Sequence, residues 1–111
     1  PFRMPWINRT PDWRRFRDVH KKLLERYCSQ VLEEMAAASR SSHSSAHDLH
    51  LEVYRLIHER DKQIANVFDD FRRSRAVMQL AIMRRLNLLT DEELSLFSEQ
   101  TRRQVEGIAS L

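Results

Sequence analysis

The chain has 111 residues, of which 41% are hydrophobic and 32% charged, and its formal net charge is +3. This length suits one domain with a modest core. The single cysteine, Cys28, cannot form an internal disulfide and fits a reducing, cytoplasmic location. No stretch approaches the ~20 apolar residues that a membrane-spanning helix needs, so we expect no membrane partner.

Glycine occurs once, and all three prolines lie within the first eleven residues. This composition predicts an all-α fold. Residues 1–10 have no helical period and predict an extended arm. Thr-Pro-Asp at 10–12 is a typical helix start, and the apolar spacing that follows predicts a helix over 11–39. Three further side chains widen its apolar face: Leu24, Cys28 and Leu32.

The segment 40–46 is polar and rich in serine, which is typical of a loop. The stretch 47–86 lacks Gly and Pro and keeps helical spacing, which predicts one long unbroken helix. Such a helix would be roughly 60 Å long. Two amphipathic helices joined by a short loop should form an antiparallel hairpin, with Phe16 opposite Phe71. The C-terminal end of the longer helix would then extend beyond the first helix, and other residues would have to bury its apolar side chains.

The C-terminal segment carries three helix-end signals. Asn87 suits a C-terminal cap in the left-handed region. Thr90 and Glu93 match a capping box that opens a short helix over 90–97. Ser98 then begins a last helix over 98–109. We expect these two short helices and the N-terminal arm to cover the overhang.

Two histidines on the predicted long helix, His47 and His50, share one face. Two imidazoles at this spacing can bind a metal ion if a third ligand comes from elsewhere. The ligand spacings of zinc fingers and the Glu-x-x-His pairs of di-iron bundles are absent. We therefore expect no metal and no cofactor, and His47 and His50 are the candidates if one binds.

Two charged residues, Asp61 and Arg75, interrupt the apolar stripe of the long helix one heptad either side of Phe68. Polar residues in such a seam commonly fix the register of packed helices. We expect Asp61 to pair with Arg26 or Lys22 on the first helix and Arg75 to pair with Asp12. The alternative is an anion-binding pocket around Arg75.

Arginine-rich segments could neutralise phosphates and give salt-sensitive binding to nucleic acid. Carboxylates at helical spacing favour an ion-paired surface instead; Asp69, for example, lies four residues before Arg73. The candidate contacts are Arg72, Arg73, Arg75, Arg102 and Arg103.

The C-terminal segment 89–111 also resembles a helix-turn-helix motif. Leu94, Val105 and Ile108 fall where that motif has core residues. The resemblance implies that Arg102 and Arg103 lie on the helix that reads the DNA. The segment departs from the motif at position 99, where glutamate stands in place of the usual turn glycine.

The chain contains no Gly-rich phosphate loop, nucleophile motif or metal-ligand signature. We therefore expect a non-enzymatic interaction or assembly protein, acting as a homodimer whose hairpins complete a four-helix bundle or binding another protein. A bare hairpin would leave a second set of apolar side chains in water, and a second copy would bury them. The expected interface residues are Val53, Leu56, Val67, Val77 and Leu80. The alternative is a nucleic-acid-binding regulatory module that uses the arginine-rich face or the C-terminal helix pair.

Overall fold

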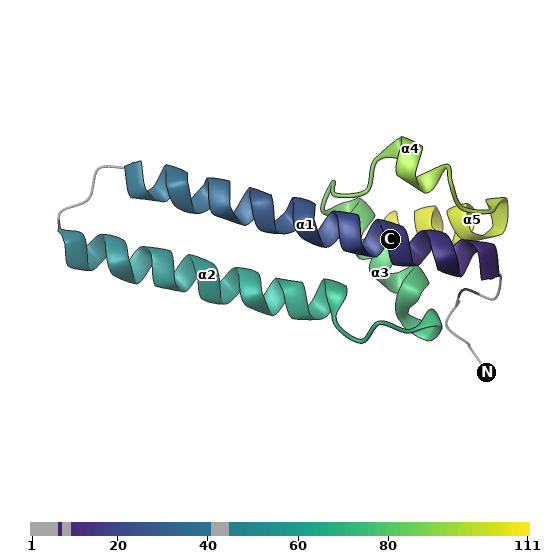
Figure 1. Cartoon of the computed structure of the whole chain (residues 1–111), viewed down its shortest axis with the longest axis horizontal. Helices are drawn as coiled ribbons and strands as arrows, with labels where there is room; N and C mark the ends of the chain where they lie inside the picture. Colours follow the sequence, from purple (N-terminus) through teal and green to yellow (C-terminus); the bar gives the residue numbers. More distant parts are fainter. Residues whose placement is uncertain (1–6, 8–9, 41–44) are drawn as a thin grey trace.

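The computed structural model describes residues 7, 10–40 and 45–111, and every regular element in this part of the chain is a helix (Figure 1). The predicted all-α fold is therefore confirmed. The predicted arm and serine-rich loop lie largely outside the described residues. The helices are α1 (Thr10–Arg40), α2 (Ala46–Phe68), α3 (Arg73–Arg85), α4 (Asp91–Leu94) and α5 (Glu99–Ala109).

Helices α1 and α2 form the predicted antiparallel hairpin (Figure 1). The Ser45 hydroxyl caps α2 by accepting a hydrogen bond from the backbone N–H of Asp48 at 3.1 Å. Contacts across the hairpin follow the expected register. The rings of Phe16 and Phe71 stack with centroids 5.5 Å apart, and the Tyr27 hydroxyl lies 3.4 Å from the Arg60 carbonyl oxygen.

The prediction of one unbroken helix over 47–86 is wrong, because the helix stops at Phe68 and starts again at Arg73. Asp70 takes a φ of 61°, a left-handed conformation that Asp adopts more readily than most residues. The ring of His20 lies 2.9 Å from the Phe68 carbonyl oxygen, and Gln79 donates to the Asp69 carbonyl at 2.5 Å. These side chains satisfy carbonyls that the helix end leaves without partners.

The break lets α3 fold back, so its apolar residues are buried rather than left overhanging. Contacts between α3 and α5 are the most extensive between any two helices in the described part of the chain. Phe97 and Val105 join the same core, and Ile7 is 1% exposed with its N–H bonded to the Arg73 carbonyl. We call residues 73–109 the lobe. The fully covered positions of α3 are Ala76, Val77, Gln79, Leu80, Ala81 and Met83.

The predicted helix ends are confirmed. Asn87 has a φ of 59° after α3. Thr90 and Glu93 form the reciprocal capping box of α4, and Ser98 caps α5. The helix predicted over 90–97 is shorter than expected and ends at Leu94.

Candidate interaction surface

The hairpin has a covered half and an uncovered half. The buried residues of α1 run only from Asp12 to Tyr27, and those of α2 are Val67 and Phe68. From 28 to 66, no described residue is buried. Figure 1 shows why: α3, α4 and α5 gather beside the N-terminal half of α1 and leave the other end of the hairpin as two helices alone.

Each hairpin helix carries an apolar stripe on the side turned away from the lobe. On α1, Lys22 and Arg26 reach toward the lobe, and helical spacing places the stripe on the opposite side. On α2, Gln63 lines a cavity with Leu86 and Leu88 of the lobe. Helical spacing places Tyr54 on the side opposite Gln63, Ile57 roughly a third of a turn from Gln63, and Val53 and Ile64 roughly a quarter of a turn from it. The two stripes therefore lie on one side of the hairpin, which we call the open face. Its residues are Leu24, Cys28, Leu32 and Met35 of α1 with Val53, Tyr54, Ile57 and Ile64 of α2.

The open face leaves large apolar side chains in water. Leu32 is 66% exposed, Tyr54 63% and Ile57 38%; the other five members are half-buried. Asp61, which is exposed, is the charged residue within the α2 stripe. The opposite side of the same half is strongly charged and includes the Arg60–Glu34 ion pair. This contrast is typical of a helix pair that exposes one side to water and binds a partner with the other.

The expected interface residues divide into two groups. Val53 and Leu56 are half-buried in the uncovered half of the hairpin. Val67, Val77 and Leu80 are 1%, 0% and 0% exposed, so the expectation that they need a second copy to cover them is wrong. The break after Phe68 explains the error, because it folds α3 onto the rest of its own chain.

The arginines proposed for nucleic-acid contact all have partners nearby. Arg72 and Arg75 approach Asp70 with nitrogen–oxygen distances of 2.5 and 3.7 Å. Arg103 pairs with Glu99 at 2.7 Å. The other two are Arg73, which lies over the ring of Trp13, and Arg102, which donates to the Phe97 carbonyl. Three of the five side chains therefore pair with carboxylates, and the other two contact a ring and a backbone carbonyl.

Among the residues that the structure describes, none joins the two histidine candidates to complete a metal site. His47 and His50 are exposed on the first turns of α2. Among the described residues, no group of three or more His, Cys, Asp or Glu side chains is placed to hold a metal ion.

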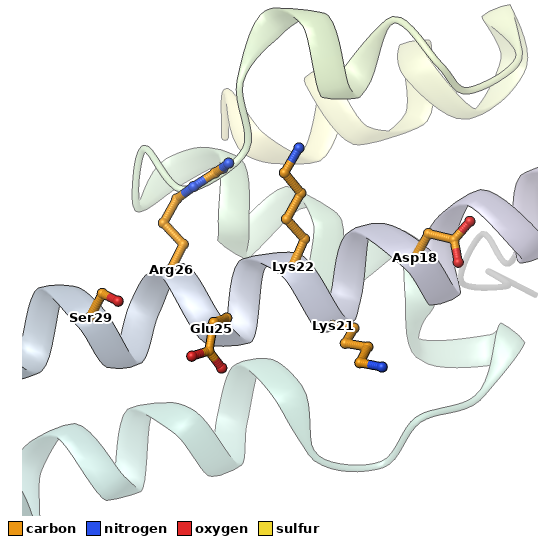
Figure 2. A pocket seen from close by; sticks show the side chains of 6 residues that line it. All are labelled: Asp18, Lys21, Lys22, Glu25, Arg26 and Ser29. Atoms are coloured by element: carbon orange, nitrogen blue, oxygen red, sulfur yellow. The ribbon is translucent and has the colours of Figure 1, made fainter.

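A partly buried ion pair joins the lobe to α1, and it was not predicted. Arg26 donates to both carboxylate oxygens of Glu93 at 2.8 and 3.0 Å; Figure 2 shows Lys22 and Arg26 reaching from α1 toward this segment. Burial raises the pKa of Glu93, but the hydrogen bonds from Arg26 and Thr90 outweigh it and lower that pKa to about 2. Arg26 and Lys22 both pair with Glu93, so the expectation that Asp61 pairs with one of them is wrong. The sequence showed Glu93 only as part of a capping box.

A second polar contact joins the start of α1 to the start of α5. Asp12, 1% exposed, accepts hydrogen bonds from the N–H of Ser98 at 2.9 Å and from the hydroxyls of Ser98 and Thr101 at 2.5 and 2.7 Å. Burial raises the pKa of Asp12, but these hydrogen bonds lower it below its ordinary value. The expected pairing of Arg75 across the hairpin is wrong, since Arg75 lies beside Asp70.

Structural side chains line two of the hollows on the surface. The wider groove, about 760 Å³, runs along α1 and is lined by the six residues in Figure 2: Asp18, Lys21, Lys22, Glu25, Arg26 and Ser29. The smaller one, about 270 Å³, includes Tyr27, whose hydroxyl donates to Gln63.

Within the described residues, no helix is both long and apolar enough to cross a membrane. Comparisons of the chain with protein families, with curated proteins and with solved structures gave no match.

Proposed function

We propose that this chain is a non-enzymatic assembly protein that forms a homodimer through the open face, with two hairpins completing a four-helix bundle. The observation that carries the proposal is the exposure of Leu32, Tyr54 and Ile57 on a hairpin half that has no third layer. A two-helix hairpin can bury only the sides that its helices turn toward each other. Another pair of helices supplies the missing layer.

The magnitudes fit a dimer of moderate affinity. Burying one Leu, Ile or Tyr gains about 1.5–3 kcal/mol when the side chain starts fully exposed. Three partly exposed side chains per copy therefore give a gross gain on the order of 10 kcal/mol. Association costs roughly 4–15 kcal/mol in lost motion and ordering. The half-buried members of the open face add to the gain, so we expect a dimer that dissociates on dilution.

A second copy is a suitable partner because the open face can pair with itself. Its eight members are apolar, with Asp61 as a charged neighbour on α2, and closed two-fold pairing is the commonest way for a chain to bury such a surface. The five arginines named for the alternative function, nucleic-acid binding, each contact another group of the chain, and three of them pair with carboxylates.

The test is a pair of charge substitutions on the open face. In the double variant Leu32→Glu/Tyr54→Glu, we expect the mass from light scattering to fall from twice 13.3 kDa to 13.3 kDa, while helical circular dichroism is retained. The matched control is Leu96→Glu, because Leu96 is 52% exposed but lies on the lobe; it should remain dimeric. A double variant with the mass of a dimer would refute the proposal.

A further inference from the structure

The break between α2 and α3 falls in a segment that suits a helix. Residues 69–72 contain neither Gly nor Pro, and the apolar spacing of α2 continues through them. Ile64, Phe71 and Met78 follow one another at steps of seven residues, so a continuous helix would place them on one side. In the bent chain, Phe71 is 43% exposed and Met78 is half-buried. The bend therefore divides an apolar stripe that a straight helix would keep together.

The bend includes an unfavourable backbone conformation and depends on residues outside the segment. Asp70 has a φ of 61°, a left-handed conformation that costs more for a residue with a Cβ than for Gly. Among the described residues, the Arg72 side chain at the start of α3 forms no cap hydrogen bond. The carbonyls at the end of α2 rely on His20 and Gln79. A straight helix would satisfy these backbone groups internally and would need no left-handed residue.

The lobe has an interface of its own and is held to α1 by side chains. Helices α3 and α5 contact each other more extensively than any other pair of described helices. The attachment to α1 includes the ion pair between Arg26 and Glu93 and the hydrogen bonds from Ser98 to Asp12. Every copy of the chain carries the same α1, so a lobe can make these contacts with another copy as well as with its own.

We infer that two copies of the chain exchange lobes. In the exchanged dimer, residues 69–72 become helical, α2 and α3 join into one helix over 46–85, and each lobe packs on the α1 of the other copy. In the bent chain, Arg60 and Leu86 line the same hollow. Twenty-six residues of straight helix would place them roughly 39 Å apart, so a straightened chain cannot pack its lobe on its own α1. A second copy supplies the contacts that straightening breaks.

The exchange requires the lobe to leave α1, so we expect it during refolding rather than in the folded chain. At high protein concentration, the lobe of one unfolded copy encounters the α1 of another. The exchanged dimer separates only if the same contacts break again, so it should persist on dilution. In this it differs from the dimer proposed above, which dissociates on dilution and uses the open face. The inference therefore does not rest on the proposed function.

The variants Asp70→Ala and Asp70→Gly test the exchange as a matched pair. Both remove the carboxylate that pairs with Arg72 and Arg75, so they differ only in backbone preference. Ala favours the straight helix, and Gly favours the left-handed bend. Each is made in the full chain carrying Leu32→Glu/Tyr54→Glu, which prevents pairing through the open face. After unfolding in urea and refolding at high concentration, we expect at least about tenfold more dimer by light scattering for Asp70→Ala than for Asp70→Gly.

The distance between two spin labels shows whether that dimer is exchanged. In a Cys28→Ser background, the labels are placed at Glu59→Cys and Arg85→Cys, which are both exposed positions. The labelled chain is refolded with an excess of unlabelled chain, so that only distances within one chain are measured. We expect roughly 39 Å in the dimer and a much shorter distance in the monomer. Equal amounts of dimer from the two Asp70 variants, no dimer from Asp70→Ala, or a dimer with the short distance would overturn the inference.

Failure of the exchange is distinguishable from failure of the proposed function. Before it is unfolded, the Leu32→Glu/Tyr54→Glu chain should have the mass of a monomer. A dimer with the short label distance at that stage would refute pairing through the open face. Absence of an exchanged dimer after refolding would overturn the exchange and leave pairing through the open face intact.

Discussion

Replacing Glu93 with Gln tests how the lobe is held against α1. The Glu93 side chain is 8% exposed and pairs with Arg26 at 2.8 Å. Although burial raises the pKa of this carboxyl, hydrogen bonds from Arg26 and Thr90 lower it from 4.5 to about 2. That difference corresponds to about 3 kcal/mol of folding free energy at neutral pH. Because the Arg26 side chain is 31% exposed, solvent screening reduces the expected loss to about 2 kcal/mol.

The same substitution should change the response to acid. A carboxyl whose pKa is lowered by folding contributes its full stability above its unfolded pKa of 4.5 and loses it as the pH falls toward 2. Wild type should therefore lose more stability than Glu93→Gln between these pH values. Urea unfolding followed by circular dichroism at neutral and acidic pH measures both effects. Asp12 also has a pKa lowered by folding, so the variant should still lose the stability that Asp12 contributes when the pH falls.

Glu92→Gln is the matched control, because the adjacent Glu92 is exposed. We expect it to stay within about 0.5 kcal/mol of wild type. If Glu93→Gln were equally harmless at neutral pH, or if it lost as much stability in acid as wild type, the ion pair would not hold the lobe in place.

Three further predictions concern stability, each measured by urea or thermal unfolding. Asp12→Ala leaves the start of α5 without its acceptor and should cost about 2–4 kcal/mol, whereas Asp18→Ala, on the exposed side of α1, should change little; equal effects would contradict the buried contact. Val67→Glu and Leu80→Glu should each cost more than about 3 kcal/mol and unfold the chain; folded monomers would mean that these positions are not core. Asn87→Ala should lose about 1 kcal/mol while Asn87→Gly loses nothing, and the reverse order would exclude a left-handed cap.

The helix ends could be predicted from sequence because a cap depends on residues close together in the chain. Thr90 and Glu93 satisfy each other's backbone N–H groups, and Asn87 adopts its left-handed conformation just beyond the end of α3. The break at 69–72 could not be predicted in this way. It contains neither Gly nor Pro, and its carbonyls are satisfied by His20 and Gln79, which lie 48 and 10 residues away from their acceptors.

The candidate surface was predicted only in part, for the same reason. Leu24, Cys28 and Leu32 could be recognised as a widening of the apolar face of α1. Which apolar residues remain exposed depends on where the lobe packs, and that depends on the break. Val67 and Leu80 are therefore buried by their own chain. The exposed apolar residues lie instead in the half of the hairpin that the lobe does not cover.

The mass of the wild-type chain in solution tests the central claim most directly. It is best measured by light scattering over a range of protein concentrations, at low and high salt, with and without a nucleic-acid duplex. We expect a species of twice 13.3 kDa that does not bind the duplex and that dissociates on dilution. A chain that stays at 13.3 kDa at every concentration, or that shifts only when the duplex is added at low salt, would contradict assembly through the open face.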